Sequence, residues 1–143
     1  MGLDMYLRGE KFVWGCEQGR AKEDGFEVAR RELELGYWRK HPNLHGFIVD
    51  TFADGVDECQ EISLGKDELK LIIDTIRAGK LREKTRTGFF FGTSYFPGEK
   101  TEEGKSYDDE LDENAVKVFE NALAWLTAED EECSRTVHYR ASW

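Results

Sequence analysis

The sequence predicts an α+β domain in which a small antiparallel sheet is packed by about three helices. Three stretches carry apolar residues at helical spacing, and several short stretches alternate apolar with polar residues, as half-buried strands do. Helices and strands are interspersed without the regular spacing of βαβ units. An antiparallel sheet covered on one face by helices is therefore the economical arrangement.

The chain has the size and composition of one folded domain. Its 143 residues include four Trp, five Tyr and nine Phe, which supply apolar area for a core although 35% of the residues are charged. Only two prolines occur, and no Ser/Gly-rich linker or internal repeat marks a boundary. We therefore expect residues 1–143 to form a single domain.

The N-terminal part predicts strands. Leu3, Met5 and Leu7 alternate with polar residues, which indicates a half-buried strand, and residues 12–14 extend this pattern toward a hairpin. Residues 15–25 are polar and contain glycine, so we expect a loop. For residues 26–35, the pattern leaves both a strand and a short helix open.

Three helices are predicted, over residues 39–52, 66–78 and 109–127. The first has an apolar face that begins at Leu44, with Pro42 in its first turn, where a missing amide proton does no harm. The second has an apolar stripe and stops at Gly79. Acidic residues in the first turn of the third helix interact favourably with the positive end of its dipole. Short strands are predicted over residues 59–64, 87–93 and 137–141.

The net charge of −10 is concentrated in the C-terminal third. Residues 1–98 carry 15 Lys or Arg and 17 Asp or Glu, whereas residues 99–113 carry eight acidic residues and two lysines. Such a surface repels nucleic-acid phosphates and attracts a basic partner. The candidate partner-binding residues are Glu102, Glu103, Asp108, Asp109, Glu110 and Asp112. The alternative is that this charge only favours solubility and a helix start.

Several classes of protein are excluded by what the sequence lacks. No apolar run approaches the roughly 20 residues needed to cross a bilayer, and the first residues do not form a signal peptide, so we expect a cytoplasmic protein without membrane contact. Cys16, Cys59 and Cys133 are odd in number and lack CxxC spacing, which favours reduced thiols. No P-loop, Rossmann or Gly-x-Ser-x-Gly motif appears. We predict no cofactor, no metal and no catalytic residue.

One cluster of polar and aromatic residues predicts a small-ligand site. Arg39 and Lys40 near a helix start would hold an anion such as a nucleotide phosphate, and Trp38 would stack on a ring. At helical spacing, Arg39 and Asn43 share a face. The candidate ligand-binding residues are Trp38, Arg39, Lys40, Asn43, His45 and Asp57. In the structural alternative, Trp38 anchors the helix, Arg39 pairs with Asp54 or Asp57, and His45 makes an internal hydrogen bond.

Two other interpretations of this segment are weighed as alternatives. His41 and His45 are four residues apart, which suits zinc ligation together with Cys59 and a nearby aspartate, although Pro42 disfavours a helical His41 and no HExxH motif is present. Cys59 and His45 also have the chemistry of a nucleophilic pair. Nothing around Cys59 matches a known nucleophile signature.

Five segments occur in a characteristic order, namely MGLDMYL at residues 1–7, YWRK at 37–40 with Asn43 and His45, DGVDEC at 54–59, GFFFG at 88–92, and YRASW at 139–143. In these segments the chain resembles a family of small uncharacterised proteins encoded by phages, prophages and bacteria. The loop over residues 15–35 and the acidic stretch over 99–109 depart from the family pattern. The resemblance implies a phage-related setting and no particular chemistry.

Two functions from different classes follow. The first is a non-enzymatic binding protein whose acidic C-terminal third occludes a basic surface of a host protein, such as a nucleic-acid-handling or defence complex, in the manner of an anti-CRISPR protein. The second is a protein that binds a nucleotide or another anion at the cluster around Trp38, Arg39, Lys40 and His45. We expect the first, without an enzymatic activity.

Overall fold

The computed structural model describes residues 2–14, 20–84, 86, 91–130 and 133–143. Its main sheet has four antiparallel strands in the order β4-β1-β6-β5, formed by Arg30–Arg39, Asp4–Val13, Cys133–Ser142 and Ile62–Ser63. A two-stranded sheet pairs β2 (Lys22–Glu23) with β3 (Phe26–Glu27). The helices are α1 (Pro42–Phe52), α2 (Lys66–Arg77), the 3₁₀ helix η1 (Lys80–Arg82) and α3 (Tyr107–Thr127). The predicted α+β class is confirmed.

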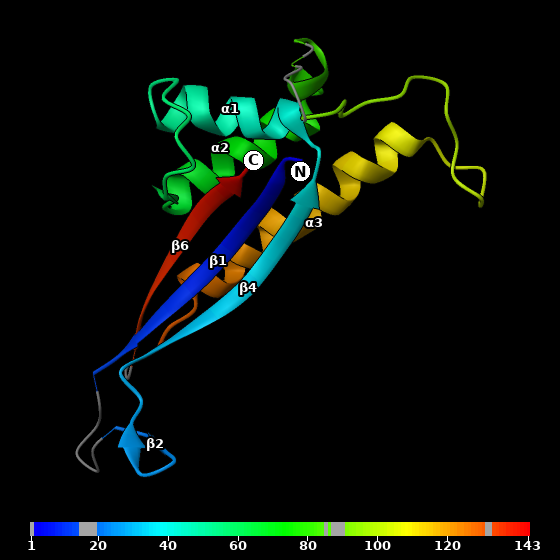
Figure 1. Ribbon diagram of the computed structural model, residues 1–143. Helices are drawn as coiled ribbons and strands as arrows, with labels where there is room; N and C mark the ends of the chain where they lie inside the picture. The colour runs from blue at the N-terminus through cyan, green and yellow to red at the C-terminus, as the bar shows by residue number, and fades with distance from the viewer. Residues whose placement is uncertain (1, 15–19, 85, 87–90, 131–132) are drawn as a thin grey trace.

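The central strand β1, near the N-terminus, pairs with β6 at the C-terminus. It pairs with β4 on one side and with β6 on the other, so that Asp4 lies opposite both Arg39 and Ser142. Leu3, Met5 and Leu7 are fully buried, as their alternation predicts. The start of β1 and the end of β6 therefore lie together beside α1 (Figure 1).

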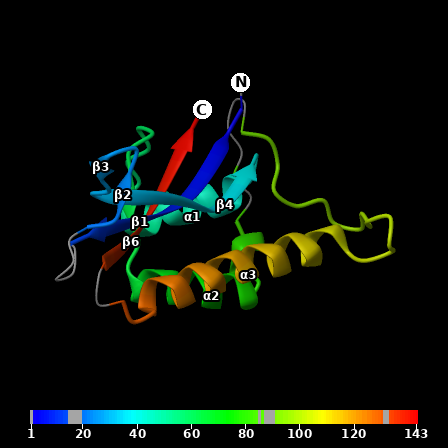
Figure 2. The same ribbon diagram turned by 90° about the horizontal axis from the view of Figure 1, so that it is seen from below.

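Helices α2 and α3 lie against each other on one side of the main sheet (Figure 2). Phe119 of α3 is fully buried and stacks on Trp38 of β4, with ring centroids 5.2 Å apart. Gly9 of β1 allows a close approach, because a Cβ atom there would lie 2.7 Å from the Trp125 ring. The core lies between the sheet and these two helices, and α1 contributes Leu44, Ile48 and Val49 to it.

The first predicted helix is wrong at its start. It begins at Pro42 rather than at residue 39, because Arg39 pairs with Asp4 in the sheet and Lys40 has a left-handed backbone (φ 55°). Proline disfavours a helical conformation in the residue before it, which here is His41. Arg39 and Asn43 therefore do not share a helix face.

Other predicted elements differ at their boundaries. Residues 26–35 form β3 and most of β4, so this segment is strand and not helix. As expected for residues 12–14, β1 continues to Val13 and pairs antiparallel with β4. The loop predicted over 15–25 contains β2, and the strand predicted over 59–64 is reduced to β5. Of the strand predicted over 87–93, residues 87–90 lie outside the described residues, and residues 91–93 form no strand. Helices α2 and α3 agree with prediction to within two residues.

The later part of the segment between η1 and α3 leaves the body of the protein. Figure 1 shows it running outward beyond the sheet to the start of α3. We call residues 96–106 the arm. No helix among the described residues has the length and apolar character needed to cross a membrane.

Candidate functional site

A hydrogen-bonded chain of three side chains joins α1, the α1–β5 loop and β6. His45 Nδ1 lies 2.5 Å from the Tyr139 hydroxyl, and His45 Nε2 lies 2.8 Å from Asp57 Oδ2. His45 and Tyr139 are buried, at 3% and 1% exposure, whereas the Asp57 side chain is 28% exposed. This series of hydrogen bonds therefore runs from the core to the surface and ends at the Asp57 carboxylate.

The direction of these hydrogen bonds follows from the acidity of Tyr139. Burial, followed by the nearby Asp57 and Cys59, raises the pKa of Tyr139 well above 10, so its hydroxyl keeps its proton. If that proton is donated to His45 Nδ1, then His45 Nε2–H donates to Asp57. In this arrangement the Tyr139 hydroxyl and both ring nitrogens of His45 have hydrogen-bond partners, as buried polar groups require.

Aromatic rings close this site. The Trp143 indole N–H donates to Asp57 Oδ1 at 3.2 Å, so both carboxylate oxygens accept a hydrogen bond. Phe91 lies edge-on to the His45 ring and tilted against Trp143, at centroid distances of 5.8 Å in each case. We call His45, Asp57, Phe91, Tyr139 and Trp143 the His45 network.

The loop that carries Asp57 has a strained backbone. Asp54 and Cys59 have positive φ angles of 53° and 58°, and Gly55 has a φ of 76°. Arg140 Nε donates to the Cys59 carbonyl at 3.0 Å and ties the loop to β6. A left-handed conformation costs a non-glycine residue roughly 1–3 kcal/mol, and such residues are common at functional sites.

A cavity of about 360 Å³ opens beside the His45 network. Asp57, Asp50 and Arg86 supply its charges, and Val49 and Phe91 supply apolar wall. The Arg86 guanidinium forms an ion pair with Asp50. Arg86 can cross α1 at this point only because residue 46 is glycine, since a Cβ there would lie 2.2 Å from its Cδ.

A second buried polar cluster holds the segment after η1 against α1. Ser94 Oγ lies 2.8 Å from His41 Nδ1 and accepts from the Asn43 backbone N–H at 2.9 Å. The Asn43 amide donates to the Leu81 carbonyl and accepts from the Arg86 backbone. Burial lowers the pKa of His41 from 6.5 to about 4, so His41 is neutral at pH 7.

The six predicted ligand residues do not meet in one pocket. Trp38 is buried on Phe119 of α3, and the exposed Arg39 lies 3.9 Å from Asp4. The structural alternative expected Trp38 on the first helix and Arg39 on Asp54 or Asp57, so it is wrong about both partners. Lys40 packs near Gly92. Asn43 is hydrogen-bonded to backbone groups of Leu81 and Arg86. Of the six predicted residues, only His45 and Asp57 line the cavity beside the His45 network.

The described residues do not support the zinc and thiolate alternatives. They contain no group of three or more His, Cys, Asp or Glu side chains that could hold a metal ion. Both nitrogens of His45 are hydrogen-bonded, to Tyr139 and Asp57, so neither is available to activate Cys59. Cys59 and Cys133 are free thiols, and Cys16 lies outside the described residues.

Three of the six predicted partner-binding acids are used inside the protein. Asp108 is buried and accepts from the Phe96 backbone N–H at 2.8 Å. Asp109 and Asp112 both bind Arg82, at 2.9 and 2.7 Å. Asp112 also accepts a hydrogen bond from the Tyr95 hydroxyl. Burial, followed by this hydrogen bond, raises the pKa of Tyr95. Glu102 and Glu103 are exposed on the arm, and Glu110 is half-buried.

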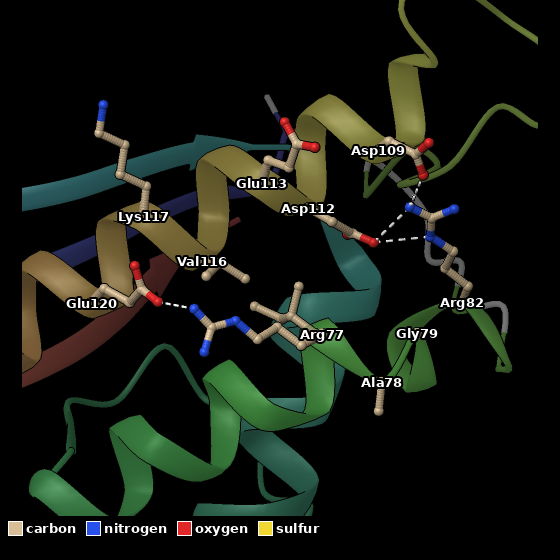
Figure 3. Close-up of a pocket in the computed structure, with 11 residues that line it drawn as sticks. Arg77, Ala78, Gly79, Arg82, Asp109, Asp112, Glu113, Val116, Lys117 and Glu120 are labelled. Carbon is tan, nitrogen blue, oxygen red and sulfur yellow. Dashed lines mark hydrogen bonds and ion pairs between the residues drawn. The ribbon is translucent and has the colours of Figure 1, made fainter.

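An open groove of about 850 Å³ lies between α2 and α3 (Figure 3). Its floor includes Ile76 and Val116, and its charges are largely paired. Figure 3 shows Arg82 reaching Asp109 and Asp112 at one end, and Arg77 reaching Glu120 at the other. These pairs connect the helices across the groove.

Sequence reasoning missed the residues that complete the site. The alternation in β6 predicts an inward Tyr139, but nothing in the sequence links it to His45, which is 94 positions away. No sequence pattern marks Arg86 as part of a site. Trp143 belongs to the C-terminal YRASW segment, and only the structure shows that its indole N–H binds Asp57.

Comparisons with protein-family models, with curated proteins and with solved structures found no match for this chain. The five members of the His45 network come from four of the five segments that carry the resemblance described above. The remaining segment forms the start of β1, in which Leu7 lies opposite Tyr139. The site therefore joins segments that are scattered along the sequence.

Proposed function

We propose that this protein is a non-enzymatic binding protein that docks its acidic C-terminal third on a basic surface of a partner. The observation that carries this proposal is the arm, on which Glu99, Glu102 and Glu103 are exposed away from the body of the protein. In the phage-related and cytoplasmic setting that the sequence suggests, the partner is a host nucleic-acid-handling or defence complex.

The carboxylates available to such a partner are a subset of the acidic stretch. Asp108, Asp109 and Asp112 already bind groups of this chain, so using them would break internal contacts. Glu102 and Glu103 of the arm, with Glu110 and Glu113 at the start of α3, carry the docking charge. Carboxylates on a projecting segment accelerate encounter with a cationic surface and occupy positions that phosphates would otherwise take.

The test is a charge reversal with a matched control. Affinity purification from the host with mass spectrometry identifies the partner, and its dissociation constant is then measured with purified proteins. The double variant E102K/E103K should bind at least about tenfold more weakly, because each close charge pair is worth on the order of 1 kcal/mol or more. The control E34K/D74K makes the same charge change at exposed positions on β4 and α2. Equal affinity of the two variants would remove the proposal.

A second candidate function is small-ligand binding, and the cavity beside the His45 network favours it. Its volume of about 360 Å³ lies at the lower end of the range of ligand sites. It shares only His45 and Asp57 with the predicted cluster. A thermal-shift panel of nucleotides and other anions tests the predicted ligand class, since a ligand at 100 times its dissociation constant adds roughly 2.7 kcal/mol.

A further inference from the structure

The charges of the cavity beside the His45 network point to a different ligand class from the predicted anion. Asp50 and Arg86 neutralise each other as an ion pair. Asp57 accepts only from the N–H groups of His45 and Trp143. Among the residues that the structure describes, no lysine or arginine pairs with Asp57. The Asp57 carboxylate thus faces the cavity held by two ring N–H groups, with no lysine or arginine partner among the described residues.

The Asp57 carboxylate is also fixed in position. Its two oxygens are each held by one hydrogen bond, and the backbone beside it is tied to Arg140. A carboxylate oxygen can accept two hydrogen bonds, so each keeps a free lone pair. Because the hydrogen bonds are formed in advance, a ligand would not have to order this side chain on binding.

We infer that this cavity binds a small organic cation, with a flat amidinium or guanidinium group on Asp57 and an apolar part against Val49 and Phe91. The cavity already holds one guanidinium, that of Arg86 on Asp50, which shows that a carboxylate there accepts such a group. A planar cation matches the two oxygens of a carboxylate better than a compact ammonium does. This inference deepens the second candidate function and is independent of docking by the arm.

The experiment compares three probes of one shape and different charge, namely benzamidine, benzamide and benzoate. Each is titrated into the full-length protein and followed by ¹H–¹⁵N NMR through the indole N–H signal of Trp143, which is assigned with the variant Trp143→Phe. Benzamidine should shift this signal saturably with a dissociation constant of about 1 mM or tighter. Benzamide and benzoate should bind at least about tenfold more weakly, since they lack the charge that Asp57 attracts.

Two variants test the role of Asp57. Asp57→Asn keeps an oxygen for hydrogen bonding but removes the charge, and it should weaken benzamidine binding at least about tenfold. Asp54→Asn is the matched control, because it removes the exposed carboxylate of the same loop and asparagine tolerates its positive φ. Asp54→Asn should bind benzamidine as the wild type does.

Each outcome decides the inference. Benzoate binding as tightly as benzamidine, unchanged binding by Asp57→Asn, or a Trp143 signal that does not respond to benzamidine would overturn it. If Asp57→Asn does not fold, the comparison of probes on the wild type decides alone. A response to nucleotides or benzoate without one to benzamidine overturns the cation and leaves the ligand-binding function standing. No response to any cation or anion removes both.

Discussion

His45 uses both ring nitrogens to connect parts of the chain that are distant in sequence. The Asp57 carboxylate can only accept, so the His45 Nε2–H donates to it, and the Tyr139 hydroxyl supplies the partner of Nδ1. Removing either partner leaves a nitrogen of a buried ring without a hydrogen bond. The contact between α1 and β6 therefore depends on the hydrogen bonds of these two ring nitrogens.

The substitution Tyr139→Phe tests this dependence. It removes the hydroxyl while keeping the ring, so His45 Nδ1 loses its donor in a buried site and unfolding free energy should fall by about 1–3 kcal/mol. Urea denaturation of the wild type and the variant measures the difference. Tyr37→Phe is the control, because that hydroxyl bonds Asp4 at the exposed surface and should matter by less than about 0.5 kcal/mol. Equal losses in the two variants would contradict the assignment.

His41 predicts a loss of stability in acid. Burial lowers its pKa to about 4 in the folded protein, whereas the unfolded chain has the ordinary value of 6.5. Between these values the unfolded state binds more protons, so the His41 contribution is complete above pH 6.5 and is lost as pH falls toward 4. The loss is on the order of 3 kcal/mol. The unfolding free energy is measured against pH between 4 and 6.5 for the wild type and for His41→Gln. It should fall more steeply with decreasing pH in the wild type. Parallel curves would contradict the prediction.

At the scale of elements, the contact between the sheet and α3 depends on glycine. A side chain at position 9 of β1 would meet the Trp125 ring at 2.7 Å, and one at position 36 of β4 would meet Val118 at 2.5 Å. Both strands therefore present glycine where α3 crosses them. The close packing of α3 is set by these two positions as much as by its own apolar face.

Gly9→Ala should destabilise the protein by about 1–3 kcal/mol, since either the indole of Trp125 or α3 itself must move. Elsewhere in a strand, the same substitution usually has the opposite effect, because glycine weakens strands. Gly65→Ala is the control. Its nearest atom is the end of the flexible Glu68 side chain, so a change below about 0.5 kcal/mol is expected in thermal or urea denaturation. A neutral Gly9→Ala would show that the contact can relax.

At the scale of the whole molecule, the acidic charge is divided between two tasks. Arg82 and the buried contacts of Asp108 use part of it to attach α3 and the arm to the rest of the fold. The exposed carboxylates of the arm are the ones to which the proposed function assigns partner binding. The net charge of −10 therefore overstates what a basic surface would meet.

Salt should weaken binding to the proposed partner, because charges exposed on the arm are screened within about 10 Å at 0.1 M ionic strength. Association rates measured by surface plasmon resonance between low and high salt should fall for the wild type. The slope should be shallower for E102K/E103K and unchanged for E34K/D74K. A wild-type rate that does not depend on salt would contradict electrostatic docking.

The elements with strong periodicity were predictable, and the connections between them were not. The stripe of α2 and the alternation of β1 depend on local spacing, which the sequence displays directly. The start of α1 was misplaced because Arg39 pairs with Asp4, a partner 35 positions earlier that no local pattern reveals. Of the candidate site, only His45 and Asp57 could be found, since they lie near each other in the chain.

The sequence by itself determined the class of fold, the positions of α2 and α3 and the location of the acidic charge, because these depend on neighbouring residues and on composition. The tertiary structure decided which polar residues work together. It buried Trp38 in the core, bound half of the predicted docking acids to internal partners, and brought Tyr139 and Trp143 to His45 and Asp57. These outcomes depend on strand order and helix packing, which bring together residues separated by most of the chain.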